Sequence, residues 1–172
     1  MSDYDIDSLI DTKLSKRSKD IRLESIKISK ANGGYHYGGS FSSAEILITL
    51  YDKILTDEDK FILSTGSEGH GFPAGIGIAF AMKQMKKKGK VYVLMGDGEC
   101  QEGTTWESLL LASHLELDNL VIIVDYNKIQ GSGYVKDILP MESILSVVNS
   151  LNWEMMEVNG HDLESIENSI KN

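Results

Sequence analysis

The sequence predicts an α/β fold built on a mostly parallel sheet. Two short apolar runs, residues 91–95 and 120–124, have the length and composition of buried strands. A glycine turn and a helical segment separate them, and Thr104 with Glu107 marks the start of that helix as a capping box. The order strand, turn, helix, strand is a βαβ crossover, in which the two strands are parallel.

Length and composition predict a single globular domain over residues 1–172. The chain is 41% hydrophobic, which is enough for a real core at this size. Its net charge of −9 argues against a nucleic-acid surface, and no apolar run approaches the length of a membrane span. The single cysteine, Cys100, excludes an internal disulfide. We therefore expect a cytoplasmic protein that contacts neither nucleic acid nor membrane.

The first half of the chain is expected to be mainly helical. Apolar positions among charges predict one or two amphipathic helices in residues 5–31. The glycines at the start of residues 31–55 indicate an irregular loop, after which Ser42 and Glu45 are expected to cap a new helix. A further helix rich in small residues is expected over residues 71–85.

In the second half of the chain, helices and strands are expected to alternate. The lysine-rich residues 86–90 are expected to be a solvated exit from the preceding helix into a strand. After the βαβ unit, residues 143–151 are expected to be helical and residues 153–158 to form a third strand. A final helix is expected through Ile166 and Ile170.

The βαβ unit also predicts a binding site. Asp97 and Asn127 each follow the end of a strand, and in parallel sheets such positions meet at one edge, where open α/β folds bind ligands. Carboxylate and amide oxygens suit Mg²⁺ or Ca²⁺. Gly96 and Gly98 allow a ligand to approach the backbone, and the helix N-terminus just beyond favours an anion. This combination predicts a site for a metal-bound diphosphate.

Two plainer interpretations of the Gly-Asp-Gly turn compete with this one. Asp-Gly between apolar runs most often makes a hairpin, but a hairpin needs a strand directly after the turn, and here a helix follows. Gly-x-Gly can also be half of a dinucleotide-binding fingerprint, yet the third glycine and the later acidic residue of that fingerprint are not clearly present.

Residues 96–130 resemble the diphosphate-binding N-terminal part of transketolase. They read GDGECQEGTTWESLLLASHLELDNLVIIVDYNKIQ. The resemblance implies a three-layer αβα thiamine-diphosphate-binding fold. It also implies that Asp97, Asn127 and the backbone carbonyl of Ile129 bind the metal. The cofactor-binding residues that it implies are Gly66, Ser67, Gly96, Asp97, Gly98, Glu99, Asn127 and Ile129.

Two histidines are candidate catalytic residues by the same resemblance. The segment ANGGYHYGGSFSSAEIL is similar to a transketolase loop whose histidine lies near the diphosphate and substrate, which points to His36. The segment TGSEGHG is similar to a turn that holds the cofactor, and His70 lies in it, where it could also serve only to cap the loop. A histidine-bearing stretch that transketolases carry between FILS and this turn is absent, so the donor and acceptor sugars stay open.

The resemblance implies a diphosphate- and Mg²⁺-binding subunit of a split transketolase-like transferase, which moves a two-carbon ketol unit from a ketose to an aldose. The catalytic glutamate of transketolases lies in a second domain that this chain does not show, so the expected partner is a pyrimidine-domain subunit. A homodimer or an α₂β₂ heterotetramer acting on a sugar or sugar phosphate would result. The alternatives are a subunit of a deoxyxylulose phosphate synthase or 2-oxo acid dehydrogenase, a non-catalytic regulatory remnant, and a plain nucleotide-binding module.

Overall fold

The computed structural model describes residues 15–34, 37–63 and 67–171. The chain divides into two compact units. Unit 1 consists of Met1–Lys53 with Asn159–Asn172, and unit 2 is the uninterrupted stretch Ile54–Val158. The expected single thiamine-diphosphate domain over residues 1–172 stays a prediction.

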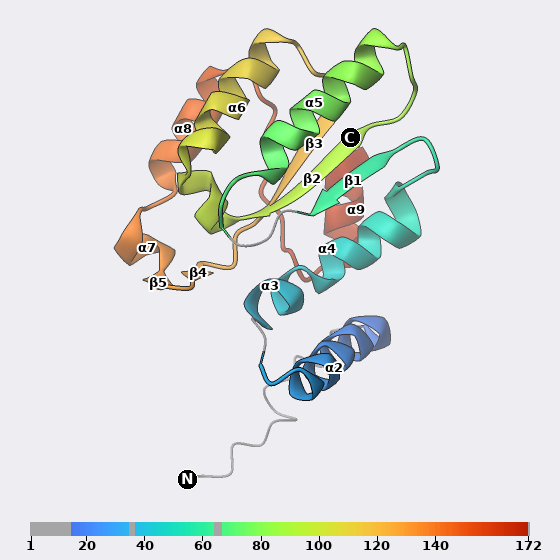
Figure 1. Cartoon of the computed structure of the whole chain (residues 1–172), viewed down its shortest axis with the longest axis vertical. Helices are drawn as coiled ribbons and strands as arrows, with labels where there is room; N and C mark the ends of the chain where they lie inside the picture. The colour runs from blue at the N-terminus through green and yellow to red at the C-terminus, as the bar shows by residue number, and fades with distance from the viewer. Residues whose placement is uncertain (1–14, 35–36, 64–66, 172) are drawn as a thin grey trace. The chain divides into compact units, whose positions relative to one another are not determined.

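Unit 2 is built on a parallel sheet of three strands, β1 (Lys60–Leu63), β2 (Val91–Gly96) and β3 (Leu120–Asp125), in the order β1-β2-β3 (Figure 1). The central strand β2 is buried along almost its whole length, as expected for a parallel strand covered on both faces. The last paired residues of β2 and β3 are Gly96 and Asp125. The predicted βαβ crossover is therefore confirmed, and both strands end at the same edge.

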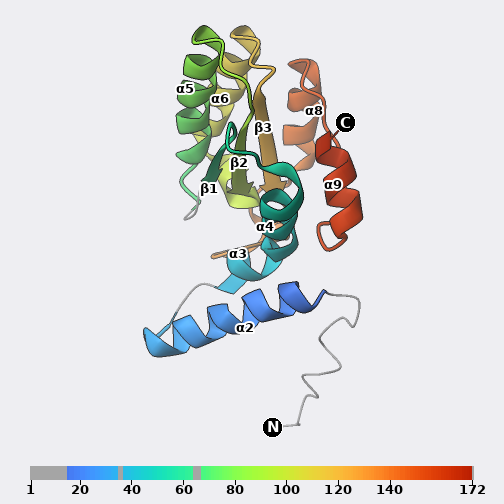
Figure 2. The ribbon, with the colours of Figure 1, turned by 90° about the vertical axis from the view of Figure 1, so that its right-hand side faces the viewer.

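Helices cover both faces of this sheet. Helices α5 (Gly71–Gln84) and α6 (Gly103–His114) lie on one side and α8 (Glu142–Ser150) lies on the other, as the edge-on view in Figure 2 shows. This arrangement confirms the predicted three-layer αβα fold and the helices predicted over residues 71–85 and 143–151. Within the described residues, no helix has the length and apolar character needed to cross a membrane.

The core of unit 2 lies between the sheet and these helices. Gly75 of α5 packs so closely on β2 that a methyl group in its place would lie 2.5 Å from Val93 Cγ2. The buried apolar residues of this core are Phe72, Ile76, Ala79, Met82, Val91, Val93, Met95, Cys100, Leu109, Ala112, Leu117, Leu120, Val135 and Met141.

Several short elements in unit 2 were not expected from the sequence. A 3₁₀ turn, η2 (Asp97–Gln101), stands between β2 and α6. A two-stranded antiparallel hairpin of β4 (Ile129–Gln130) and β5 (Gly133–Tyr134) follows Asn127, and the short helix α7 (Val135–Ile138) comes directly after it. These elements shape the edge of the sheet where the predicted site lies.

Unit 1 is helical and joins segments from both parts of the chain. It contains α2 (Lys16–Ala31), α3 (Tyr37–Ser42), α4 (Ala44–Thr49) and α9 (Leu163–Lys171), and α4 continues as a π-helical turn, η1 (Leu50–Ile54). The prediction of a helix within residues 5–31 is confirmed for α2, and residues 5–14 lie outside the described part. The final helix predicted through Ile166 and Ile170 is confirmed as α9.

A buried ion pair holds unit 1 together. The Glu45 side chain on α4 is 1% exposed and accepts hydrogen bonds from both Arg22 Nη atoms at 2.8 Å. His161, just before α9, contacts the same carboxylate through Nδ1 at 3.1 Å. Burial alone would raise the pKa of Glu45, but the hydrogen bonds from Arg22, His161 and Ser18 together lower it from 4.5 to about 2.

Three predictions about local structure are wrong. Residues 153–158, all of which are described, form no strand. The glycine-rich segment after residue 36 is not all loop, because Gly38 lies in α3. Ser42 does not cap a helix. Its hydroxyl instead donates to Gly38 O at 2.8 Å, α4 begins after Ser43, and Glu45 is taken by Arg22.

Candidate functional site

Asp97 links the two loops that the sequence predicted to meet. It directly follows β2, and its carboxylate is buried, with the residue only 3% exposed. Asp97 Oδ2 accepts a hydrogen bond from the backbone N–H of Lys128 at 2.9 Å. Since Lys128 lies between Asn127 and Ile129, this bond brings the Asp97 side chain next to the loop that carries the other two predicted metal ligands.

The loop of residues 127–129 is held in one shape by its own hydrogen bonds. Asn127 Oδ1 accepts from the N–H of Ile129 at 2.9 Å, which is an Asx turn. Lys128 adopts a left-handed backbone conformation with φ of 69°. Its carbonyl accepts from the N–H of Val135 at 3.1 Å, which ties the loop to the end of the β4-β5 hairpin. The loop is therefore fixed on both sides.

The turn after β2 is fixed by buried polar groups. Glu99 is 1% exposed, and its Oε2 accepts from the N–H of Gly96 at 2.8 Å. Thr105 Oγ1 donates to the Glu99 carbonyl at 2.6 Å. Glu99 thus stabilises the turn through its carboxylate and its backbone carbonyl. Its predicted contact with a cofactor stays a prediction.

The predicted capping box at Thr104 and Glu107 is wrong. Helix α6 begins at Gly103 with Glu102 as the N-cap, and that cap makes no side-chain hydrogen bond. Thr104 Oγ1 points instead to the carbonyl of Gly69 at 3.5 Å. Because η2 intervenes between β2 and α6, the start of α6 does not directly follow the Gly-Asp-Gly turn as the sequence suggested.

Two segments converge on Gly98 of this turn. A methyl group built on Gly98 would lie 3.0 Å from Ser67 Oγ and 3.5 Å from Gln130 Cδ. Ser67 itself has a left-handed φ of 57°, and Gly69, with φ of 68°, approaches the first turn of α6 too closely for any side chain. The structure therefore brings Ser67, Gly98 and Gln130 together around one point. Sequence reasoning missed Gln130, although it follows Asn127 by only three residues.

The electrostatics of the site favour a cation. Burial raises the pKa of Asp97, and the nearby Asp125 carboxylate raises it further, although backbone N–H groups oppose both effects. A buried carboxylate whose charged form is disfavoured gains most from a bound cation. Burial also raises the pKa of Cys100 to about 12, so this thiol stays neutral and is no nucleophile.

The residues at this edge fit a hard divalent cation and a diphosphate. A carboxylate, an amide oxygen and a backbone carbonyl are hard oxygen ligands of the kind that Mg²⁺ and Ca²⁺ prefer. Within the described ranges, no group of three or more His, Cys, Asp or Glu side chains forms an alternative metal site. Glycine at position 98 leaves the backbone of the turn without a side chain, as the close approach of a ligand to the backbone requires.

The predicted catalytic histidines have different outcomes. His36 lies outside the described residues, as does Gly66 of the predicted cofactor set. His70 occupies the N-cap position of α5 but makes no capping hydrogen bond, so the loop-capping interpretation is wrong. Its side chain is 75% exposed and its Nδ1 lies 3.3 Å from Glu68 Oε2. A catalytic role for His36 or His70 stays a prediction.

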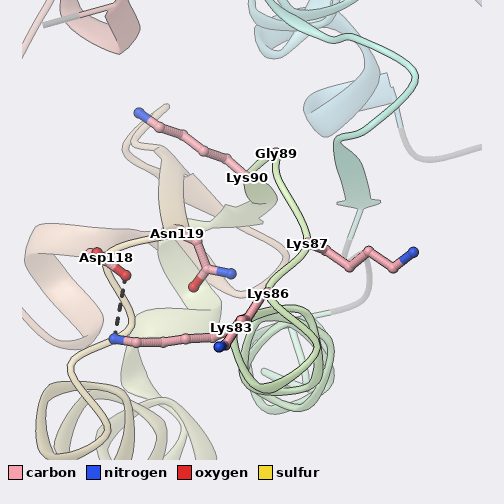
Figure 3. Close-up of a pocket in the computed structure, with 7 residues that line it drawn as sticks. All are labelled: Lys83, Lys86, Lys87, Gly89, Lys90, Asp118 and Asn119. Carbon is pink, nitrogen blue, oxygen red and sulfur yellow. Dashed lines mark ion pairs between the residues drawn. The ribbon is translucent and has the colours of Figure 1, made fainter.

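A cavity lies at the other end of the strands. It has a volume of about 590 Å³, and Asn119, which directly precedes β3, lies within it (Figure 3). The Lys87 and Lys90 side chains point away from one another, and Lys83 pairs with Asp118 at 3.4 Å. The residues that line it are Lys83, Lys86, Lys87, Gly89, Lys90, Asp118 and Asn119. None of the predicted site residues belongs to this cavity.

Comparisons with known proteins identify the family and the fold of this chain. A family model described as the thiamine diphosphate binding domain of transketolase matches residues 61–172. One of the subunits of the apulose-4-phosphate transketolase from Actinobacillus succinogenes is 42% identical over 109 residues, which cover 63% of this chain and 40% of that protein. The 6-deoxy-6-sulfo-D-fructose transketolase subunit SqwG of a Clostridium species is 34% identical over 109 residues, with the same coverage of both chains.

The solved structures show the same fold. Transketolase from Campylobacter jejuni superposes with a TM-score of 0.83 at 21% sequence identity, covering 91% of this chain and 34% of that one. This chain thus spans about 40% of the length of the curated relatives named above and about a third of the solved structure. The resemblance predicted from residues 96–130 is confirmed, and the chain belongs to the transketolase family through its thiamine diphosphate binding domain.

Proposed function

We propose that this chain is the diphosphate- and Mg²⁺-binding subunit of a two-chain transketolase, which transfers a two-carbon ketol unit from a ketose to an aldose. The observation that carries the proposal is the hydrogen bond from Lys128 N–H to the buried Asp97 carboxylate. This bond joins the Asp97 carboxylate to the loop of residues 127–129, which supports the proposal that Asp97, Asn127 and Ile129 hold one cation with oxygen ligands.

The residues of the chain have separate roles in this proposal. Asp97, Asn127 and the carbonyl of Ile129 hold the cation, and the backbone at Gly96 and Gly98 approaches the diphosphate. Glu99 and Thr105 keep the turn in place from the protein side. Thiamine diphosphate, when bound, would supply the carbanion chemistry for the reaction. In this reaction the C–C bond next to the ketose carbonyl breaks, and a new C–C bond forms to the aldose.

The partner is proposed to be a separate chain that carries the pyrimidine-side domain with its catalytic glutamate. Two of the similar proteins are themselves named as subunits of transketolases, which supports a divided enzyme. The proposed substrate is a small ketose or ketose phosphate. We propose an α₂β₂ assembly for the active enzyme.

Reconstitution tests this function. The chain is purified with and without a candidate pyrimidine-domain subunit, and thiamine diphosphate with Mg²⁺ is titrated into each by calorimetry. Ketol transfer is then measured with a panel of ketose donors and aldose acceptors. We expect Mg²⁺-dependent binding, and transfer only when both chains are present. Full transfer by this chain alone, decarboxylation of pyruvate in place of ketol transfer, or binding of ATP or NAD instead of thiamine diphosphate would each overturn the proposal.

A further inference from the structure

A buried donor at the site has no partner in the part of the chain that the structure describes. The side-chain nitrogen Nε2 of Gln130 is buried and finds no hydrogen-bond partner among these residues. A buried donor without a partner carries an energetic cost, and native proteins retain few of them. By contrast, Gln101 of the same unit donates its Nε2 to the Leu139 carbonyl at 3.0 Å.

The backbone around Gln130 holds this amide in place. Gln130 pairs with Gly133, and its neighbour Ile129 pairs with Tyr134, in the β4-β5 hairpin. The residue before Ile129, Lys128, is bonded on both sides, through its N–H to Asp97 and through its carbonyl to Val135. Hydrogen bonds on both sides therefore fix the backbone position from which the Gln130 side chain extends.

The amide lies beside Gly98, where the backbone of the turn carries no side chain of its own. A methyl group on Gly98 would lie 3.5 Å from Gln130 Cδ and 3.0 Å from Ser67 Oγ. A ligand oxygen close to Gly98 would thus lie near two neutral polar groups, the Ser67 hydroxyl and the Gln130 amide. Asp97, Asp125 and Glu99 lie nearby, so an anion at this point needs donors in addition to a metal ion.

We propose that Gln130 is a cofactor-binding residue whose Nε2 donates a hydrogen bond to a diphosphate oxygen held close to Gly98, near the Ser67 hydroxyl. This inference rests on the proposed function, because it takes the ligand to be a metal-bound diphosphate. Gln130 is a neutral donor, so it strengthens binding without competing with the cation for the Asp97 carboxylate. The unsatisfied donor in the free protein then becomes satisfied on binding.

The test uses Gln130→Met, which keeps the length of the side chain but removes the donor. Binding is measured by calorimetry with two probes, Mg²⁺–thiamine diphosphate and Mg²⁺–pyrophosphate, on the chain together with its pyrimidine-domain subunit. Loss of one hydrogen bond to a charged acceptor is expected to weaken both probes by the same factor, about 10- to 100-fold. Gln84→Met, at an exposed position at the end of α5, is the matched control and should bind both probes like wild type.

Stability of the free protein gives an independent result of opposite sign. Removing an unsatisfied buried donor should raise the midpoint of thermal unfolding of Gln130→Met by about 2–4 °C, even though its ligand affinity falls. A purely structural glutamine would instead lower the midpoint when it is replaced.

Each outcome of the binding experiment decides a separate point. If wild type binds neither probe, the proposed function fails and takes this inference with it. If wild type binds and Gln130→Met binds equally well, the function stands and the inference is wrong. Weaker binding of thiamine diphosphate with unchanged binding of pyrophosphate would also overturn the inference, because Gln130 would then contact the organic part of the cofactor.

Discussion

Replacing Asp97 by Asn or by Ala separates its two roles, as a hydrogen-bond acceptor and as a charge. Asn keeps an oxygen that can accept from Lys128 N–H, whereas Ala removes the acceptor altogether. Asn also removes the buried charge, whose unfavourable burial shows in the raised pKa of Asp97. The charged carboxylate attracts a divalent cation more strongly than a neutral amide does.

The magnitudes follow from these differences. In the absence of metal, Asp97→Asn should be at least as stable as wild type, since the cost of burying a charge is gone. Asp97→Ala should be about 1–3 kcal/mol less stable than Asp97→Asn, because Lys128 N–H is left without its acceptor. Both variants should bind Mg²⁺–thiamine diphosphate at least about 100-fold more weakly, which corresponds to about 2.7 kcal/mol.

Urea unfolding without metal and calorimetry with Mg²⁺ measure the two effects. Asp118→Asn is the control, because it changes the net charge by the same amount at a side chain that is 85% exposed. If Asp97→Asn binds the cofactor as tightly as wild type, Asp97 is not a metal ligand. If Asp97→Ala is as stable as Asp97→Asn, the bond to Lys128 does not hold the 127–129 loop.

The core and unit 1 allow two further predictions. Gly75→Ala should lower the free energy of unfolding by about 1–3 kcal/mol because the new methyl group meets Val93. Gly77 has open space around it, so Gly77→Ala should raise the free energy of unfolding by about 0.5–1 kcal/mol. Equal effects of the two substitutions in urea unfolding would contradict the packing of α5 on β2. The lowered pKa of Glu45 means that its pairing with Arg22 stabilises unit 1 fully above pH 4.5 and loses this effect as the pH falls towards 2, a change of about 3 kcal/mol. Glu45→Gln should unfold without that pH dependence, and hydrogen exchange of α2 amides across this range measures the difference.

The parts of the fold that follow from local pattern were predictable from the sequence. The strands β2 and β3 were found because apolar runs of strand length end at Gly96-Asp97 and at Asp125. The predicted capping boxes failed because their residues have other partners: Ser42 donates to the Gly38 carbonyl, and Glu45 pairs with Arg22. Thr104 reaches the Gly69 carbonyl, which lies 35 residues away in the chain, and no local motif signals that contact.

The meeting of the two loops that carry Asp97 and Asn127 was predictable from the sequence, but the geometry of the loops was not. Asp97 and Asn127 were identified because both follow strand ends that share an edge. The bond from Lys128 N–H to Asp97 depends on a left-handed residue with a long side chain, where a sequence pattern would favour glycine or asparagine. The unpaired amide of Gln130 becomes apparent only when its surroundings are known, because glutamine is an ordinary residue in a turn.

The discontinuity of unit 1 has a consequence for how the chain folds as it is synthesised. Unit 2 is a single uninterrupted stretch, so all of its partners are present once residue 158 has left the ribosome. The contact between Glu45 and His161 in unit 1 forms only after residue 161 has been synthesised, because it joins residues 116 positions apart. At typical synthesis rates of about 5–20 residues per second, the second half of that contact emerges several seconds after the first. The sheet that carries Asp97 can therefore be complete while the helices of unit 1 still lack α9.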